Sequence, residues 1–362
     1  MNRSTSPLAL AGLILLLALS AIACDITINI EGLGQPRTVT TSHEGDWYEI
    51  YFTNPTCPDD HERVGGVDQI IADDLLLAER SVDIAAFDLD AEPIVAALIA
   101  LAQRGVTVRV VTDDQNDDLT SIRRLRRHGT SVVTDGRSAL MHNKFIVIDD
   151  RYVWTGSMNY TSNGAYCNNN NAVRFDSPEL ATNFRTEMDE MYDDRRFGPT
   201  SPDHIPYPRL QINEALIETY FTAEADASAA ITRRVAEAQE EILFMAFSFT
   251  DDAIGEAMLE RAAAGVEVQG VFERVGSETS FSLYPAMRDS GLRNVRVRQD
   301  GNPRIMHHKV IVIDREVVVF GSYNFSASAN ERNDENVVIV HDPVFASYFV
   351  DEFGFVWAEA QQ

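Results

Sequence analysis

Two segments of the chain carry histidine, lysine, aspartate, glycine, serine and asparagine at the same spacing. The first motif consists of His142, Lys144, Asp149, Gly156, Ser157 and Asn159. The second motif consists of His307, Lys309, Asp314, Gly321, Ser322 and Asn324. So many fixed residue types do not recur at fixed distances by chance. The chain therefore holds two copies of one functional set.

The spacing within each motif gathers its polar side chains around one pocket. Side chains two positions apart on a strand point to the same face, so the histidine and lysine of each motif face together. A hairpin after each pair brings the asparagine back beside them. A neutral imidazole can attack phosphorus, while ammonium and amide groups hold anionic oxygens and stabilise charge in the transition state. Two facing sets therefore predict phosphodiester chemistry.

The composition limits the partners of such a site. The chain has 30 lysine and arginine residues against 56 aspartate and glutamate residues, a formal net charge of -26. An acidic surface repels nucleic-acid backbones and disfavours non-specific nucleic-acid binding, although a local basic groove remains compatible with it. No cysteine and histidine cluster in the sequence has metal-ligand spacing, so we expect neither a metal nor another cofactor.

The elements that position the motifs also repeat along the chain. Ala86-Phe87 in the first half matches Ala246-Phe247 in the second, and Gly105-Val106 matches Gly265-Val266. Strands are expected at 82–87, 106–112, 145–149 and 152–155, and again at 241–247, 266–272, 310–314 and 317–320. Amphipathic helices, each closed by a glycine, are expected at 94–104 and 254–264. This alternation predicts the α/β class, with helices packed on a mixed sheet.

The repeat divides the chain into two domains. We expect the first domain at 47–196 and the second at 210–362. The proline-rich stretch 197–209 between them breaks both periodicities and is interpreted as a linker. Residues 1–23 are interpreted as a signal peptide, and residues 24–46 as a polar spacer.

The N-terminus indicates export. Arg3 precedes an apolar run, residues 8–18, that is too short for an ordinary spanning helix. Small residues then lead to Cys24, as in bacterial lipoprotein signals, in which the cysteine is lipidated after cleavage. We therefore expect an exported cell-envelope lipoprotein held at a bacterial membrane through Cys24. Plain secretion and an uncleaved anchor are the alternatives.

Two further cysteines, Cys57 and Cys167, remain in the first half. In an oxidising compartment they could pair. Two free, buried thiols fit the sequence equally well, because the sequence does not show whether their geometry allows a disulfide.

The paired motif resembles that of the phospholipase D superfamily, and the resemblance covers nearly the whole chain after the signal. The second half, from Phe247 to Asn336, is similar to the small bacterial nucleases of that superfamily. The resemblance implies two tandem α-β-α sandwich domains related by a pseudo-two-fold axis, with one site between them and a phosphohistidine intermediate. It implies these roles: nucleophile and general acid for His142 and His307, phosphate binding for Lys144, Lys309, Asn159 and Asn324, and structure for Asp149 and Asp314.

The two halves differ at one position that matters for catalysis. Glu335 follows the second motif, and the matching position after the first motif is Asn170. A carboxylate on Nδ1 makes Nε2 a better nucleophile, whereas a neutral amide orients the ring without raising its basicity. By similarity to tyrosyl-DNA phosphodiesterases, we assign His142 with Glu335 as nucleophile and His307 with Asn170 as acid. The reverse assignment also fits the sequence.

Other residues have plainer interpretations. Ser157 and Ser322 either contact phosphate or close a tight turn after glycine. His308 is expected to face away from His307 as a bystander. The aromatic residues Phe87, Phe247 and Phe249 are interpreted as strand core rather than a substrate groove. The arginines at 123–127 are interpreted as a solvated helix face.

Several functions remain open from the sequence. The leading hypothesis is hydrolysis of phospholipid at a membrane surface, where an anchor raises the effective concentration of the substrate. An extracytoplasmic nuclease is the main alternative. Phosphatidyl transfer of the cardiolipin synthase type and a degenerate binding module are the others. Because one chain carries both motifs, we expect a monomer.

Overall fold

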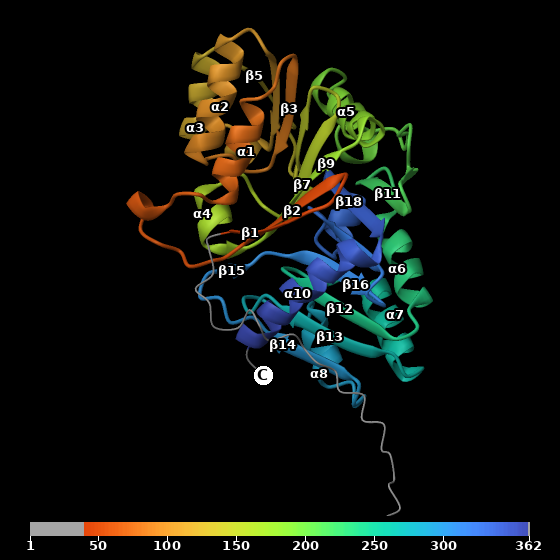
Figure 1. The fold of residues 1–362 in the computed structure, drawn as a ribbon. Coiled ribbons are helices and arrows are strands. Elements are labelled where there is room, and N and C mark those ends of the chain that lie inside the picture. Colours follow the sequence, from red (N-terminus) through yellow and green to blue (C-terminus); the bar gives the residue numbers. More distant parts are fainter. Residues whose placement is uncertain (1–39, 361–362) are drawn as a thin grey trace, which may run out of the picture. The chain divides into compact units, whose positions relative to one another are not determined.

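The computed structural model describes residues 40–360, which form two halves of the same construction (Figure 1). The expected signal peptide and the lipidation site at Cys24 lie outside these residues. The first half contains β1 (Thr40–Glu44), β2 (Tyr48–Thr53), α1 (Val67–Leu75), β3 (Ser81–Ala86), α2 (Glu92–Gln103), β4 (Thr107–Thr112), α3 (Thr120–Arg127), β5 (Ser131–Thr134), β6 (Lys144–Ile148), β7 (Tyr152–Gly156), α4 (Ser162–Tyr166), β8 (Asn168–Asn169), β9 (Asn171–Asp176) and α5 (Pro178–Tyr192). The second half contains β10 (Arg209–Ile212), β11 (Ala215–Thr222), α6 (Ala227–Glu237), β12 (Glu241–Ala246), α7 (Asp252–Ala263), β13 (Glu267–Phe272), α8 (Leu283–Arg288), β14 (Val295–Gln299), β15 (Ile305–Met306), β16 (Lys309–Ile313), β17 (Val317–Gly321), α9 (Ala327–Glu331), β18 (Glu335–His341) and α10 (Pro343–Glu359).

Each half is built on an eight-stranded mixed sheet with the same strand order. The first sheet runs β1-β2-β9-β7-β6-β3-β4-β5, and the second runs β10-β11-β18-β17-β16-β12-β13-β14. β3, β4 and β5 are parallel to one another, as are β12, β13 and β14, and the remaining neighbours in both sheets are antiparallel. The motif strands β6 and β16 occupy the central position beside β3 and β12. Both motifs are thus held by the most buried part of their sheets.

Three hydrophobic cores hold these layers together. One core lies between the first sheet and the helices α1, α2 and α3. A second lies between the second sheet and α6, α7 and α8. The third joins the halves: α5 and α10, which pack on the inner faces of their sheets, contribute Phe184, Met188, Phe345 and Phe349 to it. The structure confirms the α/β class with two tandem α-β-α sandwich domains.

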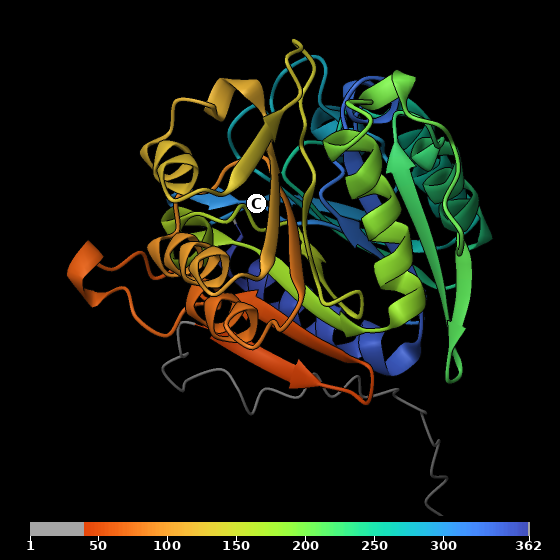
Figure 2. The same cartoon turned by 90° about the horizontal axis from the view of Figure 1, so that it is seen from above.

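The first sheet begins within the stretch that we expected to be a spacer. β1 pairs with β2 from Thr40 opposite Thr53 to Glu44 opposite Glu49, and the two strands lie side by side in both views (Figures 1 and 2). At the other boundary, β10 begins at Arg209, and the expected linker contains a short 3-10 turn at Gly198–Thr200. Among residues 40–360, no helix combines the length and apolar character that crossing a membrane requires.

Two features left open by the sequence take a definite form. Cys57 and Cys167 form a disulfide, which ties the segment before α1 to the end of α4, just before β8. The arginines of α3 are paired on the surface, Arg124 with Glu92 and Arg126 with Asp117. Their interpretation as a solvated helix face therefore agrees with the structure.

Candidate active site

Each motif strand is fixed at its far end by the motif aspartate. Asp149 accepts the backbone N–H groups of Glu79, Arg80 and Ser81 at 2.7–2.9 Å. Asp314 accepts those of Gln239, Glu240 and Glu241 at 2.7–2.9 Å. These carboxylates lie at the opposite ends of β6 and β16 from the motif histidines. Their contacts are those of structural residues and not of catalytic ones.

The two motif histidines are each oriented by a residue of the other half. His142 Nδ1 lies 2.7 Å from Glu335 Oε2, and His307 Nδ1 lies 2.9 Å from Asn170 Oδ1. Asn170 Nδ2 donates to the carbonyl of Gly164, so its oxygen is the atom that faces the ring. In both neutral rings Nδ1 therefore carries the proton, and Nε2 keeps its lone pair.

The main chain repeats this exchange between the halves. The His142 N–H donates to the carbonyl of Asp334, and the His307 N–H donates to that of Asn169, both at 2.9 Å. β15, which directly precedes His307, pairs with β8 of the first half. Each histidine is thus fixed to the other half through both its backbone and its ring. The two halves must be docked for either ring to be placed.

The motif serines support the partners of the histidines. Ser322 Oγ donates to Glu335 Oε2 at 2.7 Å, and Ser157 Oγ donates to Asn170 Oδ1 at 2.9 Å. Each serine oxygen also accepts a backbone N–H, from Asn336 or Asn171 respectively. Both serines are fully buried. The structure therefore directs their hydroxyls toward the histidine partners.

The motif glycines allow two strands to approach closely. A Cβ at Gly156 would lie 2.4 Å from the carbonyl oxygen of Asn171, and one at Gly321 would lie 2.3 Å from that of Asn336. Both glycines also have positive φ, at 151° and 145°. Glycine is needed here because any side chain would push away the strand that carries the histidine partner.

The motif lysines are buried at the centre of the site. Lys144 Nζ donates to the carbonyl of His142 at 2.8 Å, and Lys309 Nζ donates to that of His307 at 3.0 Å. Burial lowers the pKa of Lys144 to about 7, although Glu335 and Asp88 raise it in part. Burial and the charge of Lys144 lower the pKa of Lys309 well below its ordinary value. An anion placed between them would raise both pKa values again.

The histidines share this electrostatic environment. Burial lowers the pKa of His142 to about 4, against the opposing charge of Glu335. Burial, Lys309 and Lys144 lower the pKa of His307 well below its ordinary value, and the charge of His142 adds to this. Burial raises the pKa of Glu335, but His142 and Lys144 lower it by more, so the carboxylate is ionised. The charged groups of the two motifs therefore lie near enough to shift one another's pKa values, so the two sets are neighbours across the interface between the halves.

The motif asparagines have polar atoms available for a ligand. The carboxamide oxygens of Asn159 and Asn324 are buried, and neither finds a hydrogen-bond partner within residues 40–360. Buried polar side-chain atoms without partners are uncommon in folded proteins. These oxygens are acceptors, so only a hydrogen-bond donor could complete them, whereas the amide N–H groups are the part of each side chain that could hold an anion.

Two aromatic residues belong to the site, contrary to their interpretation as strand core. The Phe87 ring lies 5.0 Å from the His142 ring, and the Phe247 ring lies 4.8 Å from the His307 ring. Lys144 and Lys309 lie over the same rings, at 5.3 and 4.8 Å. Their position directly after β3 and β12 could have revealed this, because those strands end beside the motifs. Phe249, by contrast, is buried in the core of the second half.

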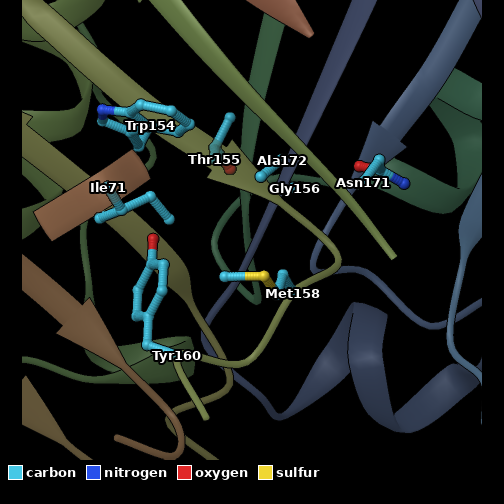
Figure 3. A pocket seen from close by; sticks show the side chains of 8 residues that line it. All are labelled: Ile71, Trp154, Thr155, Gly156, Met158, Tyr160, Asn171 and Ala172. Atoms are coloured by element: carbon cyan, nitrogen blue, oxygen red, sulfur yellow. The ribbon is translucent and has the colours of Figure 1, made fainter. Parts of the chain in front are cut away.

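A small void lies behind the first motif (Figure 3). It is lined by Ile71, Trp154, Thr155, Gly156, Met158, Tyr160, Asn171 and Ala172. None of the motif histidines or lysines lines it. This void belongs to the packing behind the Gly156-Ser157 turn and not to the site itself.

Both halves of the chain are similar in sequence to known proteins. A family model described as "Cardiolipin synthase, PLD-like domain" matches residues 71–192 and 231–357. The chain is 30% identical over 156 residues to "Phospholipase D" of Rickettsia bellii, which covers 41% of this chain and 76% of the relative. It is 33% identical over 136 residues to "Mitochondrial cardiolipin hydrolase" of Xenopus tropicalis, covering 36% of this chain and 63% of that protein.

A solved structure extends the likeness to both halves. Phosphatidylserine synthase of Haemophilus influenzae matches 89% of this chain and 88% of its own, with a TM-score of 0.63. At 13% identity, this match shows a shared fold and no more. The family model, in contrast, matches most of the chain, once in each half, so the chain belongs to the phospholipase D superfamily and is a phosphodiesterase of that superfamily.

Proposed function

We propose that this phosphodiesterase is a phospholipase D, which cleaves phospholipids to phosphatidate and the free headgroup alcohol. The observation that carries the chemistry is the unequal pairing of the two imidazoles, His142 with a carboxylate and His307 with an amide. Two histidines with different partners suit two different roles, one as nucleophile and one as acid.

In the first step, His142 Nε2 attacks phosphorus and forms a phosphorus–nitrogen bond. The bond between phosphorus and the headgroup oxygen breaks, and that oxygen takes a proton from His307 Nε2. The ionised Glu335 stabilises the positive charge that develops on the His142 ring. Asn170 orients His307 without adding a charge that would hold its proton.

In the second step, water replaces the headgroup alcohol. His307, now neutral, accepts a proton from water, and the oxygen attacks the phosphohistidine. The phosphorus–nitrogen bond breaks, which releases phosphatidate and restores His142 and protonated His307. An alcohol in place of water would give phosphatidyl transfer by the same route.

The remaining motif residues hold the phosphate. Lys144 and Lys309 supply positive charge, and we assign Asn159 and Asn324 to phosphate binding through their amide N–H groups, which can donate to phosphate oxygens. Ser157 and Ser322 hold the partners of the histidines, because their hydroxyls donate to Asn170 and Glu335. We therefore assign the serines to positioning and not to phosphate binding. Protonation of the lysines and of His307 is favoured when the anionic diester enters.

Several observations support a lipid rather than a nucleic acid as the substrate. Two relatives of the chain are named phospholipase D and cardiolipin hydrolase. The formal net charge of -26 opposes binding of a long polyanion. The loop after β13 exposes Val275 and Phe281, and Glu273 holds both the Val275 N–H and the Met306 N–H beside His307. A loop that exposes two large apolar side chains and is joined so closely to the site suits contact with a lipid surface.

We propose that the enzyme acts as a monomer on the periplasmic or cell-surface side of a bacterial membrane, held by lipidated Cys24. The disulfide between Cys57 and Cys167 supports an oxidising compartment. Mass spectrometry of the mature N-terminus tests the anchor. A diacylated Cys24 agrees with it, and an unmodified N-terminus contradicts it.

The substrate is tested by assaying purified protein in EDTA on phosphatidylcholine, phosphatidylglycerol, single- and double-stranded DNA, and RNA. We expect release of the headgroup alcohol from vesicles and loss of this activity in His142→Ala. Cleavage of nucleic acid alone would identify a nuclease instead. Products esterified to an added alcohol would identify a transferase, and no turnover of any diester would contradict the enzyme class.

A further inference from the structure

Asn143 and His308 occupy the middle position of the two motifs and point away from the catalytic face. Both side chains are fully buried. On the opposite face, each is bonded to the other half. Asn336 Nδ2 donates to Asn143 Oδ1 at 2.9 Å, and Asn171 Nδ2 lies 3.0 Å from His308 Nδ1. His308 is therefore no bystander, contrary to its sequence interpretation.

Each contact continues into the helix that packs on the inner face of the sheet. Asn143 Nδ2 donates to Glu187 Oε1 of α5 at 3.1 Å, and His308 Nε2 lies 3.3 Å from Glu352 Oε1 of α10. We name Asn336, Asn143 and Glu187 the first ladder. We name Asn171, His308 and Glu352 the second ladder. The two ladders occupy equivalent positions in the two halves and cross between them in opposite directions.

The orientation of the amides is fixed by further contacts. Thr155 Oγ1 donates to Asn336 Oδ1 at 2.6 Å, so the Asn336 amide nitrogen faces Asn143. The Ser157 N–H donates to Asn171 Oδ1 at 3.3 Å, so the Asn171 amide nitrogen faces His308. In Figure 3 the Asn171 side chain points away from the void and toward the ribbon of the second half. His308 Nδ1 is therefore an acceptor, and its Nε2–H donates to Glu352.

The ladders are joined by sequence to the groups that orient the catalytic histidines. Asn336 directly follows Glu335, and Asn171 directly follows Asn170. Because successive side chains of a strand alternate, Glu335 meets His142 on the catalytic face while Asn336 meets Asn143 on the other. A shift of β18 against the first motif would break both bonds together.

We infer that Asn336 and Asn171 are positioning residues, which lock the register of the two motifs across the interface and so aim His142 and His307 at one phosphorus. The inference rests on the proposed function, because these residues act through Glu335 and Asn170. Full burial and two hydrogen bonds to each amide make the lock rigid. A misplacement of catalytic groups by about 1 Å can lower a rate roughly 10²-fold.

The test is Asn336→Leu, which keeps the number and branching of the side-chain heavy atoms but removes the ladder. We expect kcat for bis-(p-nitrophenyl) phosphate to fall roughly 10²-fold with little change in KM, because substrate binding by the lysines persists. The acid limb of the pH–rate profile should move to lower pH, since Glu335 no longer raises the pKa of His142 fully. Wild-type kcat and an unmoved limb would overturn the inference.

Phe345→Leu is the matched control, because it perturbs the core between the halves without touching a ladder. It should lower Tm but leave kcat and the acid limb unchanged. Suppose that Phe345→Leu and Asn336→Leu lower Tm equally and also lower kcat equally. The ladder then has only a structural role, and the inference is overturned. If Asn336→Leu does not fold, Thr155→Val replaces it, and an unmoved acid limb in that variant overturns the inference.

An NMR measurement separates this inference from the proposed function. In protein with 15N-labelled histidine, the His142 Nδ1–H signal reports the bond to Glu335 whether or not any diester is hydrolysed. We expect this signal to shift or exchange rapidly in Asn336→Leu and to persist in Phe345→Leu. Absence of turnover by the wild type would defeat the proposed function alone, whereas an unchanged signal in Asn336→Leu would defeat the ladder.

Discussion

His142 donates its Nδ1 proton to Glu335, a residue 193 positions later that the other half supplies. Both side chains are buried, and the carboxylate stays ionised because His142 and Lys144 outweigh the effect of burial on its pKa. The bond leaves Nε2 unprotonated, with its lone pair free for attack. A nucleophile assembled in this way exists only when the two halves are docked.

Replacing Glu335 by Gln should separate the charge of this partner from its geometry. A glutamine oxygen can still accept the Nδ1 proton, as Asn170 does for His307, so the tautomer is kept. Loss of the charge lowers the pKa of His142 below about 4 and makes the ring a weaker nucleophile. We expect kcat to fall roughly 10²-fold and the acid limb of kcat/KM to move to lower pH.

The control for that change is Asn170→Ala, which removes a neutral acceptor from His307. It should lower kcat without moving the acid limb, because no charge near His142 is lost. Equal shifts of the limb in both variants would show that the charge of Glu335 does not tune His142.

The motif serines offer a second asymmetry. Ser322 donates to an ionised carboxylate, whereas Ser157 donates to an amide. A hydrogen bond to a charged group is roughly twice as strong as one between neutral groups. Ser322→Ala should therefore reduce kcat more than Ser157→Ala, by about 10-fold, corresponding to a difference of about 1.4 kcal/mol. Measured KM should stay similar in both variants. A large rise in KM would instead point to direct phosphate contact by the hydroxyls.

The pKa values of the motif lysines predict how the affinity for an anion depends on pH on the alkaline side. In the empty site Lys144 titrates with a pKa of about 7, and a bound anion raises this value. Binding of an anion must then take up protons, so affinity weakens as pH rises through 7. Calorimetry with an alkyl phosphonate monoester, whose charge is constant over this range, measures both the affinity and the proton uptake. Lys144→Met should bind more weakly, and its pH dependence should be smaller.

The close strand approach at the second motif predicts a steric effect. In Gly321→Ala, the new Cβ would meet the Asn336 carbonyl at 2.3 Å, and positive φ adds strain. We expect a loss of about 2–3 kcal/mol in the free energy of unfolding. Gly354→Ala, at an exposed position of α10 with no neighbour within 4 Å, should instead stabilise the protein by about 0.5–1 kcal/mol. Urea titration measures both.

Periodicity was enough to predict most of the fold around the site. The strand expected at 145–149 is β6 at Lys144–Ile148, and the helix expected at 254–264 is α7 at Asp252–Ala263. The local hydrophobic pattern determines these elements, since their packing faces repeat at regular intervals. The sequence does not predict β1, because Thr40–Glu44 is a polar edge strand without a hydrophobic pattern of its own. It is a strand because it pairs with β2.

The sequence predicts the residue types of the site. It does not predict the contacts on the opposite face of the motif strands. Equal spacing of the two motifs identified the histidines, the lysines and the pair Glu335 and Asn170. The ladder through His308 was missed, because a residue between two catalytic positions gives no signal of its own without the partner strand. The sequence likewise predicts a core position for Phe87 and Phe247, because hydrophobicity does not show which end of a strand meets the other half.

The account rests most directly on a covalent bond between phosphorus and His142. Rapid quenching of His307→Ala during turnover of bis-(p-nitrophenyl) phosphate should trap the adduct, because the leaving group needs no proton but hydrolysis of the adduct needs a base. Peptide mass spectrometry should locate the p-nitrophenyl phosphoryl group on His142, with none in His142→Ala. An adduct on His307 trapped in His142→Ala, or no adduct in either variant while turnover continues, would contradict the account.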